Sequence, residues 1–215
     1  MESKLVIKSL EVGLLQTNCY ILWESDSRQS IVVDPAAEEE RILRTLEKEN
    51  VTVEKIVLTH GHFDHIGAVN ALKKHTGADV WIHEADAGML ENPEQNFSTF
   101  LGTPYSCPHD GFLEEGQRIP IGSLAIHVLY TPGHTLGSTS FLGDGFVIVG
   151  DTLFQGSVGR TDFPGSSGEL LLQSIRQQLM VLDDETRVYP GHGPATTIGR
   201  ERKRNPFLVG DPSYI

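Results

Sequence analysis

The sequence predicts an α/β fold in which two β-sheets are covered by helices. Strand-like and helix-like runs alternate along the chain, and the first half contains a β-α-β unit. The second half adds short strand-like runs separated by glycine and proline. Because 215 residues are enough to bury one core, we expect a single domain over residues 1–215, with a short C-terminal tail after about residue 198.

In the first half, apolar runs alternate with amphipathic segments. Short apolar runs predict strands, whereas apolar residues spaced three or four apart predict a helix face. The expected strands are residues 5–10, 19–23, 31–33, 56–59 and 80–82. The expected helices are residues 37–49 and the segment of Ile66, Val69 and Leu72, which Gly77 ends.

The second half begins with an irregular stretch, residues 91–111, in which Pro93, Pro104 and Pro108 disfavour regular structure. We expect a long loop there that covers a site. Strands are expected at residues 124–130, 140–142, 146–149 and 187–189. A helix is expected over residues 169–182, because its leucines and Ile175 share one face.

Composition excludes several classes of partner. A net charge of −12 argues against nucleic acid, since binding to phosphate backbones draws on a basic face. No apolar run approaches the roughly 18 residues of a membrane span, so we expect no membrane partner. No secretory signal pattern opens the chain and two cysteines are too few for a disulfide framework, so we expect a cytoplasmic protein. The basic stretch over residues 200–204 is either a solvated helix face or a grip on a small anionic substrate.

The segment Thr59-His60-Gly61-His62-Phe63-Asp64-His65 concentrates three imidazoles and a carboxylate in six positions. Zinc, iron and manganese prefer such ligands, whereas calcium draws almost wholly on oxygen. Alternate side chains of an extended segment share a face, and Gly61 permits a turn. The pattern predicts a loop at a strand end that directs ligands into two neighbouring metal sites.

Three further positions follow strand-like runs directly and stand beside glycine: His134, Asp151 and His192. Side chains at strand ends converge on one edge of a sheet, so we expect these three to join the histidine-rich segment. The other four histidines lack this setting, and surface or packing roles are expected for His75, His83, His109 and His127.

The histidine-rich segment and the segments of His134, Asp151 and His192, in this order, resemble the metallo-β-lactamase fold superfamily, and the resemblance covers nearly the whole chain. The resemblance implies an αββα sandwich with a two-metal centre at one edge. It assigns His60, His62 and His134 to the first metal. It assigns Asp64, His65 and His192 to the second metal, with Asp151 bridging both. It also places Asp34 near the metal ligands; the alternative is a helix-capping or turn residue before Pro35.

Two adjacent cations lower the pKa of bound water to roughly 7, so that a metal-bridging hydroxide is present at neutral pH. Zinc is the expected metal, with iron and manganese as alternatives. Asp64 is expected to orient the hydroxide through its second carboxylate oxygen. No G-x-S-x-G segment indicates a serine nucleophile.

Within the superfamily, Gly150-Asp151-Thr152-Leu153-Phe154 and the segment from Gly156 to Gly165 are similar to glyoxalase II-like hydrolases, which cleave hydroxyacyl-glutathione thioesters. The segments Pro190-Gly191-His192-Gly193-Pro194 and Arg204-Asn205-Pro206-Phe207 resemble the short bacterial type. This resemblance implies a small anionic thioester as substrate, whose leaving thiolate needs little acid catalysis.

The sequence departs from full-length glyoxalase II where that family holds the glutathione end with Lys-x-Tyr. Here the positions are Arg160-Thr161-Asp162. Arg160 either grips a substrate carboxylate or forms a structural ion pair with Asp162 or a neighbour.

Two other functions are consistent with the motifs. The Gly159-Arg160-Thr161-Asp162-Phe163 segment also resembles persulfide dioxygenases, which use one iron and molecular oxygen. In that alternative, His60, His134 and Asp151 hold the iron. A metal-binding module without catalysis is the third hypothesis, although the sequence retains all seven candidate ligands.

Overall fold

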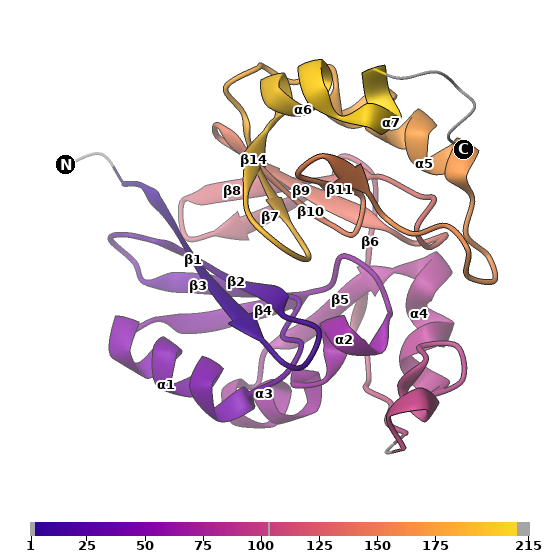
Figure 1. The fold of residues 1–215 in the computed structure, drawn as a ribbon. Helices are drawn as coiled ribbons and strands as arrows, with labels where there is room; N and C mark the ends of the chain where they lie inside the picture. The colour runs from indigo at the N-terminus through magenta and orange to yellow at the C-terminus, as the bar shows by residue number, and fades with distance from the viewer. Residues whose placement is uncertain (1–2, 103, 210–215) are drawn as a thin grey trace.

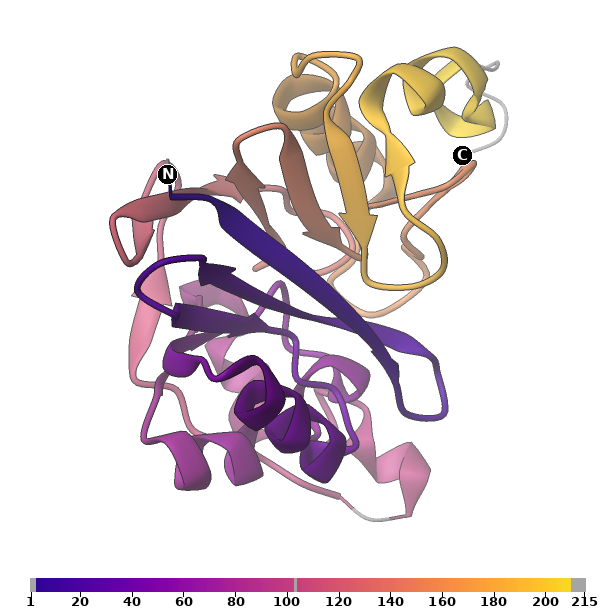
Figure 2. The same ribbon diagram turned by 90° about the vertical axis from the view of Figure 1, so that its left-hand side faces the viewer.

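The computed structural model describes residues 3–102 and 104–209. Two six-stranded sheets face each other, and the helices lie on their outer faces (Figures 1 and 2). This arrangement is the αββα sandwich, so the predicted fold class is confirmed. No helix among the described residues is long and apolar enough to cross a membrane.

The first sheet has the strand order β1-β2-β3-β4-β5-β6. Its first three strands pair antiparallel, and parallel pairing continues from β3 to β6. The strands are β1 (Leu5–Val12), β2 (Thr17–Glu24), β3 (Gln29–Val33), β4 (Thr52–Val57), β5 (Asp79–His83) and β6 (Gly111–Leu113). The helices are α1 (Glu39–Glu49), α2 (Phe63–Ile66), α3 (Val69–Thr76) and α4 (Glu84–Glu91), followed by a short 3₁₀ turn, η1 (Ser98–Leu101).

The second sheet has the order β14-β13-β10-β9-β8-β7, in which only β10 and β13 pair in parallel. Its strands are β7 (Arg118–Ile121), β8 (Leu124–Tyr130), β9 (Thr139–Gly143), β10 (Phe146–Gly150), β13 (Arg187–Pro190) and β14 (Thr196–Thr197). A small hairpin joins β11 (Leu153–Phe154) and β12 (Ser157–Val158). The helical segments are α5 (Gly168–Ser174), the π-helical turn η2 (Ile175–Leu179), α6 (Ile198–Arg204) and α7 (Pro206–Val209).

The apolar core has three layers, one between the sheets and one beneath each layer of helices. β2 is buried along its whole length because one face packs against the second sheet and the other against α1 and α3. Near-continuous apolar runs such as Ile31–Val33 are typical of strands covered on both faces. This packing fixes the strand ends that carry the candidate site.

Several element boundaries differ from the sequence-based expectation. The strand expected to reach Thr59 ends at Val57, and two short helices replace the single expected helix after it. The expected loop over residues 91–111 contains the turn η1, while α4, β6 and β7 had no clear sequence signal. The helix expected to reach residue 182 ends at Leu179, and the expected tail forms α6 and α7. Short elements on a strongly packed framework depend on tertiary contacts, which a local pattern does not contain.

Candidate metal centre

The metal loop, residues 59–65, leaves the end of β4 and runs into α2. His60 and His62 lie in the extended part, whereas Asp64 and His65 lie in the first turn of α2. Gly61 lets the loop press against α4, because a Cβ at this position would lie only 2.7 Å from the Cβ of Met89. The loop therefore directs its histidines inward, and all three are buried.

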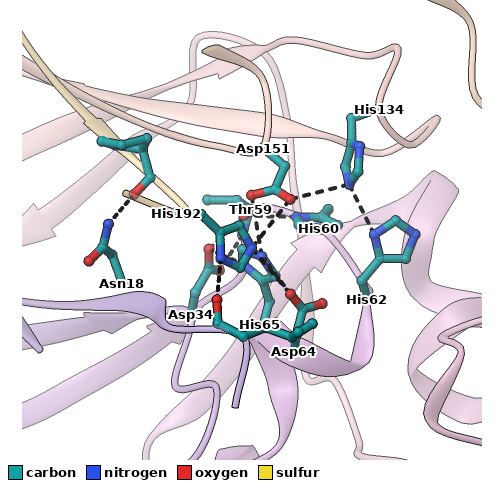
Figure 3. Close-up of polar contacts among 12 residues, drawn as sticks. Asn18, Asp34, Thr59, His60, His62, Asp64, His65, His134, Asp151 and His192 are labelled. Carbon is teal, nitrogen blue, oxygen red and sulfur yellow. Dashed lines mark hydrogen bonds and ion pairs between the residues drawn. The ribbon is translucent and has the colours of Figure 1, made fainter. Parts of the chain in front are cut away.

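The second sheet supplies its candidate ligands from three separate strand ends. His134 lies in the loop of residues 131–138 after β8, here called the His134 loop. Asp151 follows β10, and His192 follows β13. Figure 3 shows these three side chains meeting the metal loop at one edge of the sandwich.

The structure brings together all seven residues that sequence analysis singled out as ligands. Donor atoms lie within 4.8 Å of one another in three groups: His60, His62 and His134; His60, His65 and Asp151; and Asp64, His65 and His192. Asp151 belongs to the middle of the cluster, because its two oxygens lie 3.4 Å from His65 Nε2 and 3.6 Å from the Nε2 atoms of both His134 and His192.

Three buried side-chain atoms that could bind a metal have no hydrogen-bond partner in the protein. They are His60 Nε2, His65 Nε2 and Asp151 Oδ1. Buried polar atoms are normally paired, so an unpaired group needs a physical reason. His62 Nδ1 and His134 Nε2 also face each other at 3.0 Å. Divalent metal ions would satisfy these nitrogen and carboxylate donors, so the residues fit such ions.

Charge is distributed unevenly over the histidines. Burial lowers the pKa of His60 well below its usual value, and burial together with His134 lowers that of His62 to about 3. Neutral imidazole is the form that binds a metal. Burial also opposes protonation of His65, but Asp151 and Asp34 outweigh it and raise its pKa. This carboxylate-rich side of the centre therefore attracts positive charge.

Asp34 supports the metal loop directly. Its carboxylate accepts hydrogen bonds from Thr59 N at 2.7 Å, Thr59 Oγ1 at 2.6 Å and His65 Nδ1 at 2.8 Å. Thr59 Oγ1 in turn lies 3.1 Å from His60 Nδ1. When both Nδ1 atoms donate, the Nε2 atoms of His60 and His65 are left free to bind metal.

Backbone carbonyls fix two further imidazoles, those of His134 and His192. His134 Nδ1 lies 2.8 Å from the Arg160 carbonyl, and His192 Nδ1 lies 3.0 Å from the Leu15 carbonyl. Asn18 holds the chain around His192, because its side chain donates to the carbonyls of Pro190 and Gly193. Sequence reasoning did not identify Thr59 or Asn18 as support. Thr59 could have been suspected from its place beside His60, whereas Asn18 had no local signal.

A model of the metallo-beta-lactamase superfamily matches residues 12–192. The chain belongs to this superfamily. The hydroxyacylglutathione hydrolase GloC of Haemophilus influenzae is similar, with 37% identity over 213 residues that cover 94% of this chain and 97% of the relative. Together the two matches identify a metallo-hydrolase.

Two solved structures of the same fold have related sequences. The BLEG-1 B3 metallo-beta-lactamase is 40% identical, with a TM-score of 0.90, and the match covers 95% of this chain and 100% of that chain. TTHA1623 in a di-iron-bound form is 36% identical, with a TM-score of 0.83, and the match covers 94% of this chain and 100% of that chain.

In this metallo-β-lactamase superfamily member, a cavity of about 720 Å³ opens beside the candidate ligands. Aromatic side chains form much of its wall, and the stretch expected to cover a site supplies two of them, Phe97 and Phe100. The ring centres of Phe97 and Phe163 lie 5.2 and 5.3 Å from that of His62, and 5.1 Å from each other. The cavity therefore offers an apolar wall next to a polar floor.

Arg160 lines this cavity, but its guanidinium is engaged by Asp162 through two hydrogen bonds of 2.9 and 2.8 Å. It also lies over the Phe163 ring, 4.5 Å from the ring centre. The sequence left two alternatives for Arg160, a contact with a substrate carboxylate and an ion pair with Asp162 or a neighbour; the structure contains the ion pair with Asp162. The basic stretch after residue 199 lies in α6, where Arg202 donates to the carbonyls of Met180 and Leu182, so this arginine supports the end of η2.

Proposed function

We propose that this superfamily member hydrolyses a thioester, of which hydroxyacyl-glutathione is the first candidate, with two divalent metal ions, most simply zinc. The observation that carries the proposal is the convergence of a complete donor set beside the cavity. The proposed ligands are His60, His62 and His134 for one ion, Asp64, His65 and His192 for the other, and Asp151 between them.

Two bound divalent ions would supply a water of lowered pKa and a Lewis acid for the carbonyl oxygen. The chain's own contribution is to hold the imidazoles of His60 and His62 neutral, to fix the orientation of the ligands and to place aromatic side chains beside them. Asp64 lines the cavity, and its Oδ2 lies 3.2 Å from His192 Nε2. The carboxylate keeps its other oxygen to accept a hydrogen bond from the attacking water, which orients that water.

The absence of another nucleophile among the described cavity residues supports water as the attacking group. Among the described residues, no serine, threonine or cysteine side chain lines the cavity. Cys19 and Cys107 are both buried, and burial raises the pKa of Cys107 to about 12, which keeps its thiol protonated and unreactive. A thioester suits such a site because the departing thiolate is stable without a strong acid.

Glutathione as the thiol carrier is supported by the likeness to GloC, which is named as a hydroxyacylglutathione hydrolase. The cavity residues predict weak binding of the glutathione part. Among the described residues that line the cavity, Arg160 is the one lysine or arginine, and Asp162 already binds its guanidinium. We therefore expect a high KM for glutathione thioesters rather than a low kcat.

The test is thiol release from S-lactoylglutathione by protein loaded separately with zinc, iron or manganese, with the bound metal counted. We expect two equivalents of metal and steady thiol release. His62→Ala should lower kcat/KM on the order of 100-fold or more, because it removes a proposed ligand. His127→Ala, which changes an exposed histidine on β8, should leave the rate unchanged. Near-normal turnover by His62→Ala would refute the dinuclear mechanism.

A persulfide dioxygenase with a single iron is the second candidate. His134 Nε2 lies 3.6 Å from Asp151 Oδ2, and the unpaired Nε2 of His60 belongs to the same cluster, so these three residues offer a two-histidine, one-carboxylate face. Oxygen uptake with glutathione persulfide by protein holding one iron, without thiol release from thioesters, would replace the hydrolase proposal. A chromogenic cephalosporin tests β-lactam hydrolysis in the same preparation, since BLEG-1 is named as a B3 metallo-beta-lactamase.

A further inference from the structure

Asp86 in α4 is a buried carboxylate that is not among the candidate ligands. Its side chain is 1% exposed, although it carries a group that normally faces water. Three donors surround it. Asp86 Oδ2 accepts from Gly61 N at 3.1 Å and Thr135 Oγ1 at 2.7 Å, and Oδ1 accepts from Gly137 N at 2.7 Å.

These donors belong to the two loops that carry the first group of proposed ligands. Gly61 separates His60 from His62 in the metal loop, while Thr135 and Gly137 follow His134 in the His134 loop. The metal loop continues from the first sheet, whereas the His134 loop connects two strands of the second sheet. One carboxylate therefore joins loops from opposite halves of the sandwich.

At the two glycine donors, both loops approach α4 too closely for a side chain. A Cβ on Gly137 would lie 2.6 Å from Asp86 Cγ, and a Cβ on Gly61 would lie 3.2 Å from the Asp86 carbonyl oxygen. These separations allow the backbone N–H groups to reach the carboxylate directly. The position of the Asp86 carboxylate is thus fixed by three hydrogen bonds and by tight packing against the two glycines.

We infer that Asp86 is a positioning residue, which sets the distance between His62 and His134 and thereby the metal affinity of the group formed by His60, His62 and His134. The two facing nitrogens of His62 and His134 lie 3.0 Å apart. A small shift of either loop changes this separation, because His62 directly follows the donor Gly61 and His134 directly precedes the donor Thr135. The inference concerns metal binding and does not depend on which substrate is hydrolysed.

A carboxylate is required because both of its oxygens accept from backbone N–H groups that cannot change their role. In Asp86→Asn, which has nearly the same shape, the amide nitrogen must face either Gly61 N or Gly137 N. Two donors then oppose each other, and one buried N–H loses its acceptor. Asp86→Asn therefore disturbs one loop while leaving the volume of the core unchanged.

The experiment measures metal binding of the full chain by competition with a chelator, and the visible spectrum of the cobalt-loaded protein. In Asp86→Asn we expect about 10- to 100-fold weaker binding of the zinc or cobalt ion held by this group, and a changed cobalt spectrum. Thr135→Val removes the hydroxyl, which bonds Asp86 Oδ2 and also lies 2.7 Å from Ser138 Oγ, but it leaves both backbone bonds to Asp86, so it should weaken binding less. Asp110→Asn, at an exposed carboxylate that also accepts from a backbone N–H, is the matched control and should bind metal normally.

Circular dichroism and thermal melting of the metal-free variants separate positioning from general support. If Asp86→Asn melts at a lower temperature yet keeps the wild-type metal affinity and cobalt spectrum, the residue only stabilises the fold and the inference is wrong. If Asp86→Asn does not fold, Thr135→Val decides: unchanged affinity and spectrum in that variant overturn the inference, and a weaker, altered site supports it.

Discussion

The two halves of the candidate centre are built differently. The first sheet supplies four candidate ligands from one continuous loop, and a side-chain network of Asp34 and Thr59 holds two of its imidazoles. The second sheet supplies three from separate strand ends, and backbone carbonyls hold His134 and His192. The ligands of the first half are thus close together in the sequence, whereas those of the second half are distant in the sequence and are brought together by the fold.

The difference predicts where the centre is vulnerable. A side-chain carboxylate can be removed by one substitution, which leaves several buried donors unpaired. A backbone carbonyl cannot be removed in that way, so its half of the centre fails only when the loop that carries it moves. Substitutions in the first half should therefore have larger effects on metal binding than comparable ones in the second.

The largest effect is expected for Asp34→Ala. This change leaves Thr59 N, Thr59 Oγ1 and His65 Nδ1 without their shared acceptor, at a cost of about 1–3 kcal/mol for each unpaired group. We expect about 100-fold weaker metal binding and a lower melting temperature. Chelator competition and thermal melting measure the two effects. Asp144→Ala, at an exposed carboxylate between β9 and β10, is the control.

Wild-type metal affinity in Asp34→Ala would contradict the difference between the two halves, because it would mean that the loop backbone alone orients His60 and His65. Asp34→Asn is an intermediate test. The amide keeps one acceptor oxygen, so its metal affinity should lie between those of the wild type and Asp34→Ala.

The same contrast explains what could be predicted from the sequence. The ligands of the metal loop lie in a six-residue pattern, His60 to His65, and alternating strand and helix runs predicted two sheets covered by helices, which the family resemblance specified as the αββα sandwich. His134, Asp151 and His192 could be singled out because each follows a strand-like run beside glycine. Asn18 and Asp86 could not be, because their partners are respectively more than 170 and at least 25 positions away in sequence. Contacts at such separation depend on the packed sheets and leave no local pattern.

A second, smaller effect is expected for Asn18→Ala, a change in β2 of the first sheet that acts on His192 in the other half of the centre. The substitution removes donors to the carbonyls of Pro190 and Gly193, at 3.0 and 2.9 Å, that hold the turn around His192. Two hydrogen bonds contribute about 2 kcal/mol in total, part of which fixes His192, so we expect about tenfold weaker binding of one metal ion. The other ion should keep its affinity.

Metal titration followed by the cobalt spectrum resolves the two ions in Asn18→Ala. Equal weakening of both ions would contradict a role of Asn18 that is confined to the turn around His192. Unchanged binding would mean that the bond from His192 to Leu15 is sufficient for this ligand.

The smallest effect on the centre is expected for Glu24→Gln, although Glu24 also joins the two sheets. Glu24 ends β2, and Ser123 in the turn between β7 and β8 donates to it through both its hydroxyl and its backbone N–H. Hydrogen bonds from Ser123 and Ser27 lower the pKa of Glu24 from the usual 4.5 to about 2. A lowered pKa means that the carboxylate stabilises the folded state above pH 4.5, and that this contribution is lost as the pH falls toward 2.

Melting of the metal-free wild type and of Glu24→Gln from pH 7 to pH 2 tests the bond between Glu24 and Ser123, because the titration of the buried histidines is common to both proteins and cancels in the difference. The wild type should melt above Glu24→Gln at neutral pH, and the difference should shrink as the solution is acidified through the range between the two pKa values. Metal affinity at pH 7 should be equal in both proteins, because Glu24 contacts no candidate ligand. A weaker metal site in Glu24→Gln would mean that the spacing of the sheets, rather than the loops at their edge, sets the geometry of the centre.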